Sequence, residues 1–522
     1  MDTVSIIGQS FSALLALVFI TIFLNTLIRR YLLKPTWPSQ SRCTSTSRRL
    51  GKFEETMEIF SNERQGCTNS CYVMMLQSKE KLEESLIRKT LIRLAKRQPM
   101  LRAITKTVSN CSWFGSSSEC YFEIIEPASV GDMINITKSD LRASQWQKSW
   151  VDIATKSVGA GLLWKLVLFS EEYLSDSENY LNTIVIRVNH CIVDGMSGMK
   201  LCKQFLNHLN SFSEDPRVHN EIVPSLELCP SFYEMIYNTQ PWSLWKYLQE
   251  TLGLYFIIKV LKRITLHISL ISKPENPHQF FMMQPKSEGR DLRCKIFSES
   301  ETLQIRKVCK SKGATVTGAL MASAYFALCK LIESEGVTKP QELMQLFAVN
   351  GLRVCNSKPP EEYVGNFFLS EMLPMPYVSS ENDFWATSQE ATKGIQNIIK
   401  ERGKDLSKHL AEYVIWTPRE MVEEVLSPNN SSKELLNYVS SAGAFTFSDD
   451  DEMSTFKLQS CLFYSIPYAF SSFSCHFNTT VNGKMAWVIV CSDFVQPTIE
   501  DQFVNLCFDT FQKEIHCQSQ EP

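Results

Sequence analysis

The sequence carries no strong excess of charge of either sign: 53 Lys and Arg residues stand against 56 Asp and Glu residues, for a formal net charge of −3. It also has no basic stripe with interleaved aromatic residues, so we expect no nucleic-acid partner. No P-loop and no H-E-x-x-H zinc motif occur, and Gly195-Met196-Ser197-Gly198 departs from the G-x-S-x-G nucleophile elbow. The sequence thus shows none of these signatures of phosphate, zinc or serine chemistry.

The 17 cysteines are scattered and odd in number. The tightest pair, Cys67 and Cys71, has three residues between its members, and no second pair follows at the spacing of a zinc finger. We therefore expect no metal site, and we interpret the cysteines as mostly reduced thiols that pack as small apolar residues. A few disulfides in a luminal domain are the alternative.

A long apolar segment lies at the N-terminus. Residues 4–28 are nearly uncharged, and residues 11–24 (FSALLALVFITIFL) are densely apolar. At about 1.5 Å per residue, a helix of this length spans the ~30 Å hydrocarbon layer of a bilayer. No cationic region precedes the segment and no small-residue cleavage site follows it, so a membrane anchor fits better than a removed signal peptide. A buried core helix is the alternative.

The charges beside this segment predict its orientation. Asp2 precedes it, whereas Arg29, Arg30 and Lys34 follow it, and the positive-inside rule then places the C-terminal part in the cytoplasm. We accordingly predict a single-pass membrane protein of the endoplasmic reticulum with a cytoplasmic catalytic part. Glycosylation sequons point the other way, although such triplets also arise by chance. They lie at Asn110, Asn135, Asn429, Asn430 and Asn478.

The chain is too long for one ordinary hydrophobic core, and 44% hydrophobic with 21% charged residues is the composition of a globular protein. Two lobes are therefore expected. We predict a transmembrane anchor at 1–34, a linker at 35–52, an N-terminal lobe at 53–215, a crossover at 216–285 and a C-terminal lobe at 286–522. Within the crossover, residues 251–272 are apolar with a cationic cluster, which fits either a helix on the membrane surface or an ordinary helix covering a sheet.

Both lobes are expected to mix helices with strands, which makes the fold class α/β. Apolar spacing predicts helices at 79–97, after Gly195, up to Gly313, at 317–332 and at 498–512. Alternation and β-branched content predict strands at 162–169, 182–189, 344–349, 472–481 and 484–491. Two local signals are specific: a capping box runs from Ser298 to Glu301, and Asn482-Gly483 is typical of a tight hairpin turn.

The stretch Asn189-His190-Cys191-Ile192-Val193-Asp194-Gly195 carries the clearest chemistry. It lies where a strand ends and a helix begins, a place that holds a side chain firmly and leaves it accessible. His190 can take a proton near neutral pH, and Asp194 can orient the turn by pairing with an arginine. Gly195 permits backbone geometry or close packing that a Cβ would block. The alternative is a histidine whose hydrogen bonds only stabilise the turn. A metal site at His190 and Asp194 lacks a third ligand nearby.

At these residues the sequence resembles the HxxxDG acyltransferase superfamily, which includes peptide-synthetase condensation domains, alcohol acetyltransferases, wax-ester synthase-like enzymes and chloramphenicol acetyltransferase. The resemblance extends over most of residues 53–515. Four further segments resemble family segments in the same order: Arg97-Gln98-Pro99-Met100-Leu101-Arg102, Gly161-Leu162-Leu163-Trp164, Ala314-Thr315-Val316-Thr317-Gly318-Ala319-Leu320, and Val349-Asn350-Gly351-Leu352-Arg353 with Val364-Gly365-Asn366-Phe367.

The resemblance implies two chloramphenicol-acetyltransferase-like α/β lobes with an active-site tunnel between them. His190 would then be the general base on an acceptor hydroxyl or amine, which attacks a thioester without a covalent acyl-enzyme. Asp194 matches a structural aspartate that pairs with an arginine, for which Arg353 is the first candidate and Arg293 the second.

Three more residues would support the site by the same resemblance: Asn189, Gly195 and Asn366. Asn189 stands where many members have the first of two histidines, and we expect activity with altered tuning. The NVPGP segment of wax-ester synthases and the DFGWG motif of plant enzymes are both missing, with Ser441-Ala442-Gly443-Ala444-Phe445 and Ser492-Asp493-Phe494-Val495 in the corresponding regions. The subfamily is therefore left open.

We predict an acyl-CoA-dependent acyltransferase that moves an acyl group to the hydroxyl of a lipid-like or small alcohol. Acyl-CoA is its co-substrate, no cofactor is bound, no metal takes part, and the membrane bilayer is a partner. Two alternatives stay open. One is an N-acyltransferase with an amine acceptor, and the other is a non-catalytic binding or scaffold protein of the same fold, for which Asn189 is the only support.

Overall fold

The computed structural model describes residues 46–518 except for 64–67, 113–114, 156–160, 216–221, 238–291, 338, 354, 356–357, 379–382, 405–417, 420–421, 424–436, 448–453, 467–472 and 493–494. These residues fall into two compact units. A small unit lies within residues 1–49 and 105–123, and a large unit comprises residues 50–104 and 124–522. Each is described by itself.

The small unit is a three-stranded sheet in the order β1-β4-β3. Its strands are β1 (Ser47–Arg49), β3 (Ala103–Ser112) and β4 (Gly115–Ile124). Within it, the Arg49 guanidinium binds the Glu119 carboxylate at 2.8 Å, and the Arg48 guanidinium lies 4.9 Å above the centre of the Phe122 ring. Exposed ion pairs of this kind contribute little, so the backbone ladder is the main support of this sheet.

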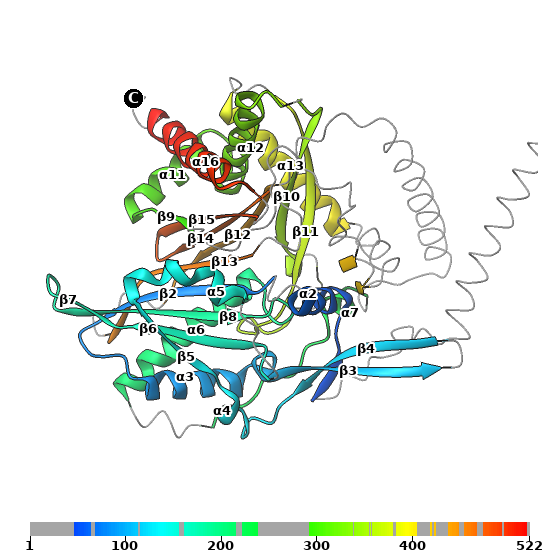
Figure 1. The fold of residues 1–522 in the computed structure, drawn as a ribbon, viewed down its shortest axis with the longest axis vertical. Helices are drawn as coiled ribbons and strands as arrows, with labels where there is room; N and C mark the ends of the chain where they lie inside the picture. The colour runs from blue at the N-terminus through cyan, green and yellow to red at the C-terminus, as the bar shows by residue number, and fades with distance from the viewer. Residues whose placement is uncertain are drawn as a thin grey trace, which may run out of the picture. The chain divides into compact units, whose positions relative to one another are not determined.

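The first sheet of the large unit has the order β13-β2-β8-β6-β5, with β7 paired to β8 (Figure 1). Its strands are β2 (Ser70–Ser78), β5 (Ile136–Arg142), β6 (Trp164–Ser170), β7 (Glu172–Leu174), β8 (Asn179–Val188) and β13 (Phe456–Ser465). The central strand β8 is rich in β-branched residues and pairs antiparallel with both β2 and β6. This double pairing fixes the strand from which the HxxxDG stretch emerges.

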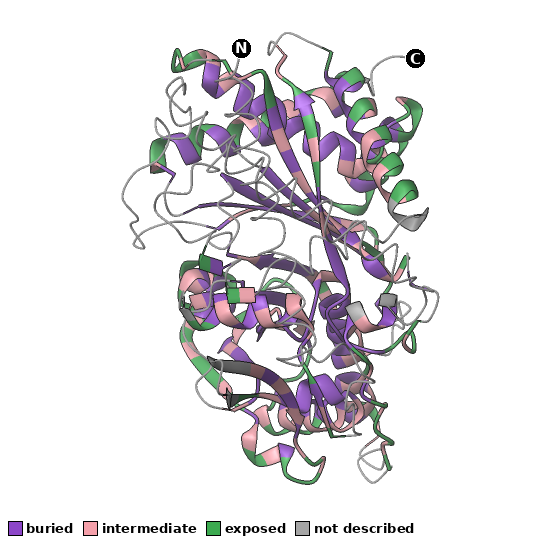
Figure 2. Cartoon of the chain, turned by 90° about the vertical axis from the view of Figure 1, so that its right-hand side faces the viewer, coloured by how far each residue is buried: buried purple, intermediate pink, exposed green. Residues whose placement is uncertain are grey.

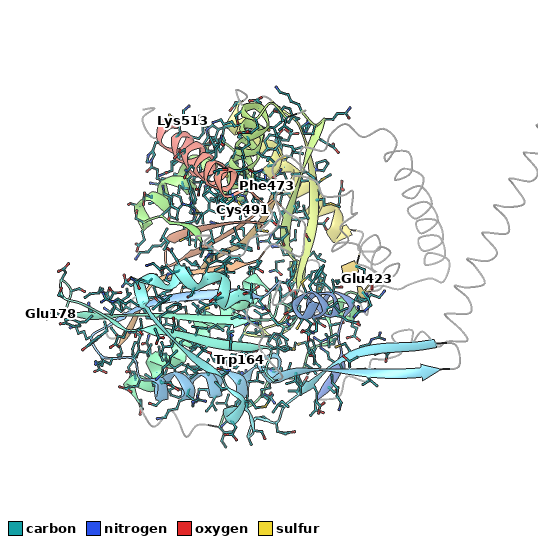
Figure 3. All side chains as sticks on the ribbon, in the orientation of Figure 1. Trp164, Glu178, Glu423, Phe473, Cys491 and Lys513 are labelled. Carbon is teal, nitrogen blue, oxygen red and sulfur yellow. The ribbon has the colours of Figure 1, made fainter. Side chains whose placement is uncertain are left out.

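Helices and short turns complete the first lobe. They are α2 (Lys52–Glu63), α3 (Glu84–Arg97), η2 (Pro99–Arg102), α4 (Val130–Met133), η3 (Ala143–Ser149), α5 (Trp150–Thr155), α6 (Gly195–Glu214) and α7 (Phe232–Tyr237). α3 packs against α6 with its apolar face inward, and Pro99 ends it as expected. Trp164, labelled in Figure 3, donates from its indole N–H to the Leu101 carbonyl at 2.7 Å and so joins β6 to η2.

The second sheet has the order β11-β10-β12-β14-β15-β9. Its strands are β9 (Arg293–Ile296), β10 (Glu342–Asn350), β11 (Phe368–Pro376), β12 (Asn437–Phe445), β14 (Ser474–Val481) and β15 (Lys484–Cys491). The predicted hairpin joins β14 to β15, where Asn482 and Gly483 have φ values of 46° and 77°. Two consecutive positive φ values are those of a type I′ turn, which explains the Asn-Gly pair.

The helices of the second lobe are α11 (Glu299–Ser311), α12 (Val316–Ser334), α13 (Phe384–Lys404) and α16 (Pro497–Gln518), with the turn η6 at Gly351–Arg353. The capping box before α11 is present in full: the Ser298 side chain accepts from the Glu301 N–H, and the Glu301 carboxylate accepts from the Ser298 N–H. α12 packs against both α13 and α16 and is the most buried helix among them. Figure 2 shows buried residues along the strands and exposed residues on the outer faces of the helices.

The strand β13 comes from the C-terminal half of the chain but pairs with β2 in the first sheet. Its Phe463 ring stacks on Tyr72 of β2 at a centroid distance of 6.1 Å and meets Phe477 of β14 edge to face at 5.4 Å. Phe463 therefore contacts both sheets. The predicted boundary at residue 286 does not include this placement of a C-terminal strand in the first sheet. Periodicity along the chain carries no information on a strand's partner.

The predicted mixed α/β fold is confirmed. The anchor at 1–34, most of the crossover and the 251–272 segment lie outside the described residues. One helix within the described part, α12, is long and apolar enough to span a membrane by length and composition, and 78% of its most apolar window is buried inside the protein. The cysteines that the structure describes form no disulfide with one another, and most of them are buried.

Candidate active site

His190 lies in the turn between the end of β8 and the start of α6. The backbone N–H of Asn189 continues the β8–β6 pairing by donating to the Leu163 carbonyl at 2.8 Å, and the Asn189 carbonyl accepts from the Ile192 N–H at 3.1 Å. Asn189 and Cys191 are buried on either side, whereas His190 is partly exposed. The strand end thus holds the histidine at the edge of the packed core.

Asp194 closes this turn and is the N-cap of α6. Its Oδ1 accepts from the Ser197 N–H at 2.7 Å, and its carbonyl accepts from the Gly198 N–H at 2.8 Å and from the Tyr72 hydroxyl at 2.9 Å. A Cβ on Gly198 would lie 1.8 Å from Cζ of Tyr72. The missing side chain therefore lets Tyr72 of β2 reach the cap.

A segment that leads into β11 lies against the same turn from the second lobe. Oδ2 of Asp194 accepts from the Phe367 N–H at 2.8 Å, and the Asp194 N–H donates to the Gly365 carbonyl at 3.1 Å. The Asn366 side-chain amide donates to the His190 carbonyl at 2.7 Å. The turn that carries His190 is therefore held by hydrogen bonds from both lobes, and the structure places Asn366 at this turn.

The imidazole of His190 packs on the ring of Phe368, the first residue of β11, at a centroid distance of 4.7 Å. Burial lowers the pKa of His190 below its usual 6.5, while the backbone carbonyls of His190 and Val193 and the negative charge of Asp194 oppose that shift. Its Nδ1 is buried and has no hydrogen-bond partner among the described residues. The ring is thus neutral at pH 7, the form that accepts a proton.

The arginine partner predicted for Asp194 is not found at the carboxylate. Arg353 lies exposed in η6, and Arg293 of β9 forms an ion pair with Asp501 of α16. Both carboxylate oxygens of Asp194 accept backbone N–H groups instead, from Ser197 and Phe367. Backbone amides satisfy a buried carboxylate as an arginine does, and no sequence pattern shows which donor is used.

Gly195 lies at the first position of α6, where close packing explains why the residue is a glycine. A Cβ there would lie 3.2 Å from Cε2 of Phe463 of β13. Its φ is not in the left-handed region, so close approach and not backbone conformation is the reason for glycine.

The chain just before this segment is held by side chains of the first lobe. Gln98 accepts from the Val364 N–H at 3.1 Å and donates to the Glu362 carbonyl at 2.7 Å, to which Gln204 also donates at 2.8 Å. Lys200 donates to the Glu361 carbonyl at 2.6 Å. The Gln98 stretch was predicted as part of the resemblance, and its contacts give it a role: it fixes the connection that reaches Asp194.

Sequence reasoning missed two residues behind the site. Glu58 of α2 is buried and its Oε2 accepts from the Asn189 side-chain amide at 2.6 Å. Phe53, also of α2, meets Phe368 edge to face at a centroid distance of 4.7 Å. α2 lies more than a hundred residues before the motif, so neither spacing nor composition could indicate these contacts.

No group of three His, Cys, Asp or Glu side chains that could hold a metal ion occurs in the part of the chain that the structure describes. The polar groups around His190 include its imidazole, the engaged carboxylates of Asp194 and Glu58, the Cys191 thiol and amides. This set can bind a proton and orient an acceptor, which suits acid–base chemistry.

Comparisons with known proteins bear on the family and the fold. Residues 155–348, which include the whole HxxxDG stretch, match the alcohol acetyltransferase family. The structure is similar to the TRI3 trichothecene 15-O-acetyltransferase from Fusarium sporotrichioides, with a TM-score of 0.62 and 14% identity over 92% of this chain and 99% of that one. No curated protein matches the sequence.

Two further structures share the fold. Polyketide synthase associated protein 5 from Mycobacterium tuberculosis is similar with a TM-score of 0.57 and 10% identity, over 89% of this chain and 98% of that one. The first condensation domain of the CDA synthetase is similar with a TM-score of 0.54 and 12% identity, over 88% of this chain and 94% of that one. The predicted resemblance to the superfamily of alcohol acetyltransferases and condensation domains is confirmed, and with it the enzyme class, acyltransferase.

Proposed function

We propose that this protein transfers an acyl group from acyl-CoA to the hydroxyl of an alcohol, with His190 as the general base. The observation that carries the proposal is the state of the His190 ring. It is partly exposed, its pKa is lowered by burial, and its backbone is held from both lobes by Asn366 and by the Asp194 cap. A rigid, neutral imidazole at the surface of a core is suited to take a proton from a bound hydroxyl.

The chemistry follows from that state. The imidazole takes the hydroxyl proton of the acceptor as its oxygen attacks the carbonyl carbon of the thioester. The new C–O bond forms, the C–S bond breaks, and the imidazolium returns the proton to the departing thiolate. No side chain becomes acylated. Asp194 takes no part in proton transfer, because both of its oxygens accept backbone N–H groups that fix the turn.

The choice of alcohol over amine rests on the comparisons. The matching family is described as alcohol acetyltransferase, and the TRI3 enzyme is a trichothecene 15-O-acetyltransferase. The first reaction to test is therefore acetyl transfer to an alcohol hydroxyl. A lipid-like acceptor and a membrane anchor at 1–34 in the endoplasmic reticulum remain part of the proposal, supported by the apolar N-terminal segment. A tunnel between the lobes is proposed from the family resemblance alone.

The function is tested with the full chain in detergent, given radiolabelled acetyl-CoA and a mixture of primary alcohols and amines of increasing chain length. Products are identified by mass spectrometry, and release of CoA thiol gives the rate. We expect esters from the wild type and a rate of ester formation about 10²- to 10⁴-fold lower from His190→Ala. Amide products would favour the N-acyltransferase, and no product from any acceptor or donor chain length would favour a non-catalytic protein.

A further inference from the structure

The carboxylate of Glu58 lies behind the turn that carries His190. Glu58 is in the second turn of α2, which belongs to the first lobe, and its side chain is 6% exposed. Its Oε2 accepts from the side-chain amide of Asn189 at 2.6 Å and lies 3.7 Å from the thiol sulfur of Cys191, which donates to it. One carboxylate oxygen therefore contacts the residues immediately before and after His190.

Asn189 links this carboxylate to the backbone of the turn. Its amide nitrogen donates to Glu58, and its amide oxygen accepts from the Cys191 N–H at 3.0 Å. The other oxygen of Glu58 accepts from Asn62 at 3.2 Å, so both ends of the carboxylate are engaged. A short bond to an ionised acceptor is stronger than a neutral one, and the desolvated surroundings strengthen it further.

Resting on the function proposed above, we propose that Glu58 is a positioning residue for the transfer reaction. Acting through Asn189 and Cys191, it fixes the peptide on either side of His190, so that the imidazole keeps the orientation needed to take the acceptor's proton. Glu58 holds this turn from the side of α2, and Asn366 holds it from the second lobe through the His190 carbonyl. Asn189 then has a specific role, since its amide can bind a carboxylate and a backbone N–H at once.

The first test is deletion. Glu58→Ala removes the carboxylate, and Glu54→Ala is the matched control. Glu54 is one turn earlier in α2, is 4% exposed, and accepts from the Gly51 N–H at 2.7 Å. With acetyl-CoA and a primary alcohol accepted by the wild type, we expect kcat to fall about 10- to 100-fold in Glu58→Ala at nearly constant KM. Glu54→Ala should keep kcat within about threefold, and Glu58→Gln, which keeps an acceptor oxygen, should retain most of the activity.

The second test moves the carboxylate from position 58 to position 189 and the amide from position 189 to position 58. It therefore does not depend on a variant that lacks the Glu58 side chain. Asn189→Asp places a second carboxylate beside Glu58 and should lower kcat by repulsion. Adding Glu58→Gln supplies a donor to that carboxylate and should restore kcat to within about threefold of the wild type. In parallel, diethyl pyrocarbonate labelling of His190, followed by peptide mass spectrometry against pH, reports the ring's accessibility and pKa without any substrate.

The outcomes are distinct. Three results together support the inference: a lower kcat in Glu58→Ala, a restored kcat in the Asn189→Asp, Glu58→Gln double variant, and altered labelling of His190 in Glu58→Ala. An inactive His190→Ala variant together with a Glu58→Ala variant that behaves as Glu54→Ala would overturn the inference and leave the proposed function intact. Full activity in His190→Ala would overturn the proposed function itself. A fall in kcat in Asn189→Asp that Glu58→Gln does not relieve would also overturn the inference, because the two side chains would then act independently.

Discussion

Asp194 and Phe367 are joined by a hydrogen bond across 173 residues of sequence, with Oδ2 of the aspartate accepting from the backbone N–H at 2.8 Å. The bond connects the cap of α6 in the first lobe to the chain that enters β11 in the second. The same carboxylate caps its own helix through Ser197. One buried side chain therefore orients the His190 turn and joins the two lobes.

We expect Asp194→Ala to lower the free energy of unfolding by about 3 to 5 kcal/mol, because it leaves two buried N–H groups without an acceptor and removes a helix cap. Arg353→Ala is the control: its side chain is exposed, and we expect a change below about 0.5 kcal/mol. Chemical denaturation of both variants measures this. Equal destabilisation by the two substitutions would indicate that the arginine pairs with the aspartate after all.

The acid limb of the activity profile follows from the lowered pKa of His190. The folded-state pKa lies below 6.5, so the imidazole is neutral at pH 7 and gains its proton only as the pH falls through that lower value. We expect kcat/KM to be flat near neutrality and to decline tenfold per pH unit below that pKa. The profile is measured with acetyl-CoA and one alcohol. A decline that begins above pH 6.5 would contradict the assignment.

The contact of Gly198 with Tyr72 predicts a steric effect near the site. A Cβ at Gly198 would lie 1.8 Å from the tyrosine ring, so Gly198→Ala should displace Tyr72 and cost about 3 kcal/mol or more. Gly195→Ala is the milder comparison, since its Cβ would meet Phe463 at 3.2 Å. Thermal unfolding of the two variants separates them, and similar melting temperatures would show that Tyr72 moves without cost.

Acid stability depends partly on His476, a buried residue of β14. Burial lowers its pKa to about 3, and its ring nitrogens bind the Trp487 indole N–H at 3.3 Å and the Ser474 hydroxyl at 2.9 Å. In the unfolded chain the ring gains a proton near pH 6.5, whereas in the folded protein it does so only near pH 3. Stability is therefore present above pH 6.5 and is lost progressively as the pH falls from there toward 3.

His476→Gln should consequently be less stable than the wild type at pH 7 but lose less of its stability between pH 6.5 and pH 4. The measurement is the melting temperature against pH for both proteins. Parallel curves would mean that other groups account for the acid dependence.

Locally encoded features could be predicted from the sequence. The capping box at Ser298 and Glu301, the Asn482-Gly483 hairpin and the helix after Asp194 each depend on residues within a few positions of one another. The helix predicted at 79–97 begins five residues later, at Glu84, because β2 continues to Ser78 and the backbone at Glu83, the N-cap, is still extended.

Long-range contacts could not be predicted in the same way. The pairing of β13 with β2, the bond between Glu58 and Asn189, and the choice of Phe367 over Arg353 as the partner of Asp194 all join distant segments. Periodicity reports which face of an element is buried and leaves its partner unspecified. Asn366 was predicted through resemblance alone, and the structure gives it a concrete contact with the His190 carbonyl.

The most direct test of the account is the turnover of His190→Ala in the full chain, with acetyl-CoA and an alcohol that the wild type accepts. General-base catalysis contributes about 10²- to 10⁴-fold, so we expect kcat to fall by that factor. The partly exposed ring makes no side-chain hydrogen bond through Nδ1, so the melting temperature should change by only about 2 °C. Wild-type turnover in this variant would contradict the assignment of His190 as the base.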